Sequence, residues 1–293
     1  MPLSALSLIL LAGLIHALWN IVAKKSGGDL AFMALTSVVM MIFWAPLGLY
    51  LGVSEVPRWG ATEWGLVWAS AVLHIGYFGI LLRGYRMADL TVVYPLARGS
   101  GPMLSSTVAL LFLGEHLTGM GLLGMVSVVL GVVLVAGGPA LWRQAHDPVQ
   151  HSRVRTGVFY GLVTGVFIAG YTVIDGYAVK AAGMSPILLD YMGNIVRLIL
   201  LLPILLPRRI DWGALWATQG RPALLIGIIS PVSYVLVLYA MQVAPLSHVA
   251  PAREVSMLFA ALLGGHLLGE RDRGMRLLGA AGIALGVILL GTS

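Results

Sequence analysis

Residues 118–134 read TGMGLLGMVSVVLGVVL, and residues 273–289 read RGMRLLGAAGIALGVIL. The two stretches align without a gap at an offset of 155 residues. The same offset joins other pairs, namely Gly114-Glu115 with Gly269-Glu270, Arg98 with Arg253, Lys25 with Lys180, and Asn20 with Asp175. One constant offset that joins matches across both halves indicates an internal duplication.

The composition indicates that the duplicated chain lies in a lipid bilayer. Its 293 residues are 59% hydrophobic and 10% charged, and their mean hydropathy is +0.93. Soluble domains carry about 25% charged residues, so one soluble core could not hide this much apolar surface. The net charge of +6 fits attraction to anionic lipid headgroups, because the Lys and Arg residues lie mostly in short loops. The absence of cysteine excludes a disulfide framework.

Ten segments are apolar and long enough to cross a hydrocarbon core of about 30 Å as helices. They are residues 3–23, 30–52, 64–84, 90–113, 118–138, 156–179, 185–206, 222–243, 246–268 and 274–292. The first is expected to be a retained span, because Lys24 and Lys25 follow the apolar stretch, whereas a cleaved signal has its basic residues first. The sequence therefore predicts an all-α membrane protein with ten transmembrane helices.

The duplication divides the chain into a first five-helix repeat at 1–138, a cytoplasmic linker at 139–155, and a second five-helix repeat at 156–293. An odd number of spans inserts the second copy upside down, which is the inverted-topology arrangement of secondary transporters with a central substrate site. Thirteen of the 18 Lys and Arg residues fall in loops after odd-numbered spans. These loops are therefore expected in the cytoplasm, and both termini outside it.

The five-plus-five spans are accompanied by FLGEHLTGMGLLGMVSVVLGVVL (112–134) and LLGERDRGMRLLGAAGIALGVIL (267–289). These features resemble the EamA-type family of the drug/metabolite transporter superfamily, over essentially the whole chain. The resemblance implies a central cavity lined by spans one, three, four, six, eight and nine, with spans five and ten packed at the back. It also implies a multi-pass exporter in the bacterial inner membrane, nearest in style to exporters of aromatic and neutral amino acids.

Two intramembrane arginines are the first site candidates, because ionisable residues inside spans are costly. Arg98 lies within VVYPLARGSGP (92–102), where the prolines and glycines are expected to open the helix, and Arg253 is its counterpart in the second repeat. We expect Arg98 to engage a substrate carboxylate, with Tyr94 beside it. The alternative is that each arginine binds freed backbone carbonyls and ties neighbouring helices together.

Further polar and aromatic candidates lie on three other helices and on the eighth span. They are His16, Trp19 and Asn20 in the first span, His74 and Tyr77 in the third, Tyr171 and Asp175 in the sixth, and Tyr234 in the eighth. Central aromatic rings combine an apolar wall with the capacity to hold a cation. The alternatives are ordinary packing and hydrogen bonding between helices, and for Asp175 solvation near the outer end of its span.

Four residues are candidates for proton coupling, namely His74, Asp175, Asp190 and Glu254. Asp190 shares a helix face with Asn194 and Arg197, and Asn194 is expected to bridge the two charges. Because the resemblance places this seventh span outside the cavity, a structural network is favoured over a proton relay. Glu115 and Glu270 are expected to accept from the first N–H groups of the helix that follows each of them.

Several chemistries have no support in the sequence. It contains no Walker A loop, no H-E-x-x-H or G-x-S-x-G motif and no zinc-ligand spacing, so neither an enzyme activity nor a metal or cofactor is predicted. No nucleic-acid partner is expected, because a soluble domain and a basic groove are both missing. The expected partners are the lipid bilayer and a small-molecule substrate, with an amino acid favoured. The chain is expected to act as a monomer.

The leading hypothesis is a secondary transporter that exports small amphipathic metabolites by alternating access, with neutral or aromatic amino acids as substrates. A second hypothesis keeps the fold but makes the substrate an anion, such as a nucleotide sugar or a phosphorylated compound. A third is a membrane enzyme or a flippase for lipid carriers, which the transporter-type repeat disfavours.

Overall fold

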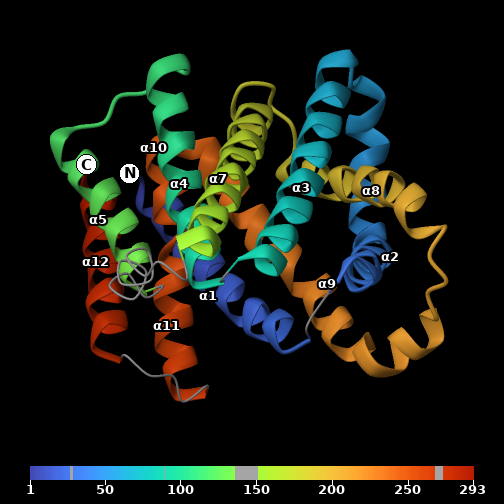
Figure 1. Ribbon diagram of the computed structural model, residues 1–293. Coiled ribbons are helices and arrows are strands. Elements are labelled where there is room, and N and C mark those ends of the chain that lie inside the picture. Colours follow the sequence, from blue (N-terminus) through green and yellow to red (C-terminus); the bar gives the residue numbers. More distant parts are fainter. Residues whose placement is uncertain (27–28, 89, 136–150, 268–272) are drawn as a thin grey trace.

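The computed structural model describes residues 1–26, 29–88, 90–135, 151–267 and 273–293 (Figure 1). Within these ranges the regular elements are helices, and no strand occurs, as predicted for an all-α protein. The first half contains α1 (Leu3–Ser26), α2 (Leu30–Glu55), the short 3-10 helix η1 (Val56–Arg58), α3 (Ala61–Met87), α4 (Leu90–Phe112) and α5 (Gly119–Val135). The second half contains α7 (His151–Lys180), α8 (Pro186–Leu205), α9 (Trp212–Val243), α10 (Leu246–Ala252), α11 (Val255–Leu267) and α12 (Arg273–Thr292).

Seven helices in the described part of the chain are long and apolar enough to cross a membrane, and α5 is a shorter apolar helix. The seven correspond to α1, α2, α3, α7, α8, α9 and α12. The other two predicted spans, the fourth and the ninth, are occupied by α4 and by the α10–α11 pair. The predicted count of ten spanning helices is therefore not reproduced by length and hydropathy. The fourth and ninth predicted spans carry the arginines and prolines that the sequence singles out.

The helix interruption lies in the second repeat and not in the first. The stretch 92–102 was expected to be open, but α4 runs without a break through both of its prolines. The break falls instead between α10 and α11. There Glu254 N donates to the Pro251 oxygen at 3.0 Å, a tightened turn in place of the α-helical bond.

Two helix starts also differ from the predicted spans. The eighth span was predicted from residue 222, but α9 begins ten residues earlier at Trp212. The Asp211 carboxylate caps this start, because its Oδ1 accepts from Ala214 N at 2.9 Å. α7 begins at His151, inside the segment 139–155 predicted as a linker. The rest of that linker up to residue 150 lies outside the described residues.

Helices α5 and α12 pack against each other at one side of the molecule (Figure 1), as predicted for the fifth and tenth spans. A Cβ atom at Gly131 would lie 2.6 Å from the Gly279 carbonyl oxygen, and one at Gly286 would lie 2.6 Å from the Gly124 oxygen. Residues 131 and 286 are 155 positions apart, and so are residues 124 and 279, so the two contacts are equivalent in the two repeats. Ser127 Oγ donates at 2.8 Å to the carbonyl of Gly282, its own counterpart. The two repeats thus meet here about an approximate two-fold axis.

The first helix of each repeat packs against the other repeat. α1 packs on α9 and α11, and α7 packs on α3 and α4. The residues at equivalent positions of these two helices, His16 and Tyr171, are thereby brought between the halves. The two chain ends lie together, since the Met1 amino group donates to the Gly291 oxygen at 3.2 Å.

Glu115 links the halves at one end of the molecule, but not in the way predicted. Its two carboxylate oxygens accept from Leu246 N and Ser247 N, each at 2.8 Å, so it caps α10 of the other repeat. α5, the helix that follows Glu115, is capped instead by Thr118 Oγ1, which accepts from Gly121 N at 3.1 Å. The counterpart Glu270 lies outside the described residues.

The pKa of Glu115 reflects two opposed effects of this position. Partial burial acts to raise the pKa of the carboxyl, but the two backbone donors from α10 and the nearby Lys180 ammonium outweigh it. The pKa therefore lies below its ordinary value. Lys180 Nζ lies 3.5 Å from Glu115 Oε1 and also donates to the Ala244 oxygen at 3.2 Å.

Candidate functional site

A cavity of about 70 Å³ lies where helices of the two repeats meet. Side chains from α1, α4, α7, α9 and α11, and from the turn before α11, form its wall. The lining residues are Ala12, Gly13, His16, Arg98, Tyr171, Ser233, Tyr234, Val237, Arg253 and Ser256. Both repeats thus contribute to one polar and aromatic pocket.

Five of the residues predicted for a substrate site line this cavity together, namely His16, Arg98, Tyr171, Tyr234 and Arg253. They come from five separate segments, so their convergence is a property of the fold and not of local sequence.

The other half of the lining was missed by sequence reasoning. It consists of small or short side chains, namely Ala12, Gly13, Ser233, Val237 and Ser256. Gly13 allows α1 to approach α11 closely, because a Cβ atom there would lie 2.5 Å from Val255 Cγ1. Helical spacing could have predicted some of these residues, because Ala12 lies one turn before His16 and Ser233 lies one turn before Val237.

Glu254 lies between the two arginines, so its negative charge offsets part of the positive charge expected at this site. Arg98 Nη2 lies 2.7 Å from Glu254 Oε2, and Arg253 Nε lies 3.6 Å from Glu254 Oε1. Arg98 Nη2 also donates to Ser256 Oγ at 3.1 Å. The Glu254 side chain is 1% exposed, against 13% for Arg98 and 10% for Arg253. The break between α10 and α11 brings this carboxylate beside α4, so the two arginines share one acid.

An aromatic wall stands on the other side of the arginines. The Arg253 guanidinium carbon lies 5.8 Å from the centre of the Tyr171 ring, a cation–π contact. His74 stacks on Tyr171 with ring centres 4.0 Å apart, and it meets Tyr234 edge-on with ring centres 5.8 Å apart. Tyr77 meets Tyr171 edge-on at 5.8 Å. Rings from α3, α7 and α9 therefore support the same face of the cavity.

Asp175 lies behind this wall and is not solvated, contrary to the alternative considered for it. Its side chain is 1% exposed. The Tyr234 hydroxyl, on a residue that lines the cavity, donates to Asp175 Oδ2, while Oδ1 has no hydrogen-bond partner. The packing of α7 against α3 and α9 covers the position, so depth along the span alone did not predict its burial.

The remaining substrate candidates do not line the cavity. Trp19 Nε1 donates to Ser233 Oγ at 3.3 Å, and Asn20 Nδ2 donates to the His16 oxygen at 2.8 Å. His74 Nδ1 lies 2.9 Å from the Ser70 oxygen, and the Tyr94 hydroxyl donates to Met257 Sδ at 3.4 Å. The structure thus places Trp19, Asn20, His74, Tyr77 and Tyr94 as contacts of the wall or of neighbouring helices.

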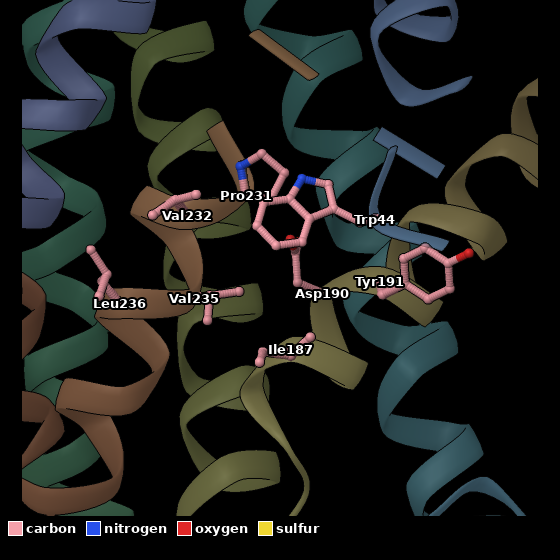
Figure 2. A pocket seen from close by; sticks show the side chains of 8 residues that line it. All are labelled: Trp44, Ile187, Asp190, Tyr191, Pro231, Val232, Val235 and Leu236. Atoms are coloured by element: carbon pink, nitrogen blue, oxygen red, sulfur yellow. The ribbon is translucent and has the colours of Figure 1, made fainter. Parts of the chain in front are cut away.

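A second pocket of about 170 Å³ lies between α2, α8 and α9 (Figure 2). Trp44, Tyr191 and Asp190 face it among aliphatic side chains. Arg197 Nη2 donates directly to Asp190 Oδ1 at 3.4 Å, so the predicted bridge through Asn194 is wrong. The long arginine side chain spans the two helical turns by itself. Asn194 Nδ2 donates instead to the Ser37 oxygen on α2 at 2.9 Å.

Among the described residues, no group of three or more His, Asp or Glu side chains is placed to hold a metal ion. The arrangement offers guanidinium groups, a shared carboxylate and tyrosine rings around one small cavity. Such a set can hold a carboxylate and an apolar or cationic group, because each has a complementary partner within the wall.

The comparisons with known proteins agree with this architecture. Residues 3–137 and 155–292 each match the EamA-like transporter family, so the two matches reproduce the two repeats. The chain is also similar to a protein of known crystal structure, with a TM-score of 0.71 and 17% sequence identity. That likeness covers 99% of this chain and 96% of the other, and at this identity it shows the fold alone.

Proposed function

Because the chain belongs to the EamA-like transporter family, we propose that it exports small amphipathic metabolites, with neutral and aromatic amino acids as the preferred class. The family makes it a multi-pass membrane protein of the drug/metabolite transporter type, whose members are transporters and not enzymes. The residues of the central cavity support the finer assignment. The location is the inner membrane, with both termini outside the cytoplasm, as the distribution of basic loops indicates.

One observation carries the substrate class, namely that two arginines and one glutamate meet beside a tyrosine wall. Arg98 and Arg253 share Glu254, so these three residues leave one positive charge unbalanced. Arg98 Nε and Arg253 Nε are buried and have no hydrogen-bond partner. Buried unpaired donors are costly, and an incoming carboxylate would satisfy them. The rings of Tyr171 and Tyr234 would contact the apolar side chain of the same substrate.

The size of the cavity fits a transport cycle in which the site opens and closes. Its volume of about 70 Å³ is well below the roughly 300 Å³ at the low end of ordinary ligand pockets. A substrate with a large side chain would therefore require the helices of the two halves to separate. We propose that the repeats rock against each other and expose the cavity to one side at a time.

Anionic metabolites with phosphate groups are the second candidate, and two buried arginines favour them. Glu254 argues against this class, because its carboxylate neutralises part of the positive charge that a phosphate would need. A membrane enzyme or lipid-carrier flippase is disfavoured by the family assignment.

Transport into or out of liposomes tests the proposal directly. Purified protein is reconstituted, the vesicles are loaded with labelled neutral amino acids, and efflux is compared with that from empty liposomes. Arg98→Gln is expected to abolish efflux, whereas Arg58→Gln, at an exposed position in η1, is expected to leave it unchanged. A thermal-shift panel of phosphorylated anions and amino acids separates the two substrate classes. The proposal fails if no neutral amino acid leaves protein-containing vesicles faster than controls.

A further inference from the structure

The buried charges around the cavity are not all paired with one another. Arg197 contacts Asp190 at 3.4 Å, and Arg98 contacts Glu254 at 2.7 Å. Arg253 has only a longer, 3.6 Å contact to a Glu254 that Arg98 already holds. Asp175 accepts from the neutral Tyr234 hydroxyl, and among the described residues no cation lies within ion-pair distance of it.

The two remaining charges, Arg253 and Asp175, flank the same pair of tyrosine rings. The Arg253 guanidinium lies over the Tyr171 ring at 5.8 Å. Asp175 lies one helical turn after Tyr171 on α7, a spacing that puts both side chains on one face of the helix. The Tyr234 hydroxyl joins Asp175 to the cavity wall. A positive and a negative group therefore each contact this wall, Arg253 through the Tyr171 ring and Asp175 through the Tyr234 hydroxyl.

Each of these two groups also has an unused hydrogen-bonding atom. Arg253 Nε and Asp175 Oδ1 are buried and have no hydrogen-bond partner. A buried polar atom without a partner is destabilising, and more so when it belongs to a charged group. The free donor matches a carboxylate, and the free acceptor matches an ammonium group.

We propose that Asp175 is the binding site for the ammonium group of the substrate, with Arg253 and Arg98 holding its carboxylate. The substrate class is then a zwitterion, an α-amino acid with an apolar or aromatic side chain, which rests on the proposed function. The ammonium group bonds Asp175 beside the Tyr234 hydroxyl, and the tyrosine rings contact the side chain. The negative charges of Glu254 and Asp175 balance the positive charges of the two arginines. A zwitterion adds no net charge to these four residues.

Three probes of similar shape test this assignment, namely phenylalanine, 3-phenylpropanoate, which lacks the ammonium group, and phenethylamine, which lacks the carboxylate. Wild-type protein in liposomes is expected to transport phenylalanine about tenfold faster, or more, than either analogue. The reason is that each analogue leaves one buried charge without its partner. Equal transport of phenylalanine and 3-phenylpropanoate by the wild type would refute the assignment of Asp175 to the ammonium group. This test needs no variant.

Two neutral substitutions should shift the preference in opposite directions. Asp175→Asn leaves an unbalanced positive charge, so 3-phenylpropanoate should overtake phenylalanine. Arg253→Gln leaves an unbalanced negative charge, so phenethylamine should gain relative to phenylalanine. Asp211→Asn is the matched control, because it makes the same change at the exposed start of α9, away from the cavity, where asparagine also caps a helix, and phenylalanine should remain preferred.

The outcomes separate this assignment from the broader function. Absence of all amino-acid transport would refute the proposed function itself. Transport of phenylalanine with the same ranking of the three probes in wild type and in folded Asp175→Asn would refute only the role of Asp175. If Asp175→Asn does not fold, the wild-type ranking of the three probes still decides the question.

Discussion

Replacing Gly131 with alanine should destabilise the protein through the α5–α12 interface. The added Cβ atom would lie 2.6 Å from the Gly279 oxygen, 2.7 Å from Ile283 N and 2.8 Å from Ile283 Cγ1. Ordinary contacts begin at about 3.4 Å, and the two nearest atoms are backbone. No side-chain rotation can relieve the overlap, so the two helices must move apart.

The magnitude follows from two opposed terms. Forcing an extra carbon into a well-packed interface typically costs about 1–3 kcal/mol. Alanine in place of glycine within a helix returns about 0.5–1 kcal/mol of intrinsic helix propensity. The net destabilisation expected for Gly131→Ala is therefore roughly 0–2.5 kcal/mol relative to wild type, and about 1–3 kcal/mol relative to an alanine at an open helix position. Gly286→Ala should cost about the same, since its Cβ meets the Gly124 oxygen at the symmetric distance of 2.6 Å.

Thermal unfolding of the purified protein in detergent measures the effect, with helical circular dichroism as the signal. Gly65→Ala is the matched control, because nothing lies within 4 Å of a Cβ atom built at this position of α3. The control should be neutral or slightly stabilised while the two interface variants melt lower. If Gly131→Ala melts at or above the control, the close approach of α5 and α12 is refuted. A large effect at Gly131 but none at Gly286 would contradict the approximate two-fold symmetry.

Two further predictions concern single charged groups. Glu115→Gln should lower stability by about 1 kcal/mol at neutral pH, because the charged form accepts two backbone N–H bonds and the position is partly exposed. Because the pKa of Glu115 is lowered in the folded protein, this stabilisation is present above the ordinary carboxyl pKa of about 4.3 and is lost as the pH falls through the lower folded value. Melting temperatures of both proteins across this range should therefore converge at acidic pH, and a constant difference would contradict the cap. Arg197→Met should lower the free energy of unfolding by roughly 3–5 kcal/mol, because it leaves the buried Asp190 carboxylate without its partner. The double variant Asp190→Leu, Arg197→Met should be less destabilised, because it removes both charges. Equal melting temperatures for the single and the double variant would count against the ion pair.

The sequence predicted those features that depend on repetition and apolar length. The offset of 155 residues predicted the paired glycine helices α5 and α12, and the structure confirms that they pack together. Apolar length placed α1, α8 and α12 within a few residues of their observed bounds. Hydropathy succeeds at this level because each span must satisfy its backbone internally in lipid, whatever its neighbours are.

Features that depend on contacts between segments were harder to predict. The prolines of α4 were expected to open it, yet α4 runs through both of them as one helix, and the break falls beside Arg253 in the second repeat. Glu115 was assigned to the correct type of helix end but to the wrong helix. The partners of Glu115 come from tertiary packing, which local spacing does not encode.

The same distinction explains the candidate site. Arg98 and Arg253 could be paired from the repeat offset, but the offset does not show that Glu254 stands between them. Its position depends on the turn between α10 and α11, because a regular helix through residues 252–255 would carry the side chain to another angle. The duplication therefore explains the two equivalent arginines. The acid that they share is positioned by a turn in the second repeat that the continuous α4 of the first repeat lacks. Under the function proposed above, this asymmetry makes the pocket suit a single carboxylate rather than a phosphate.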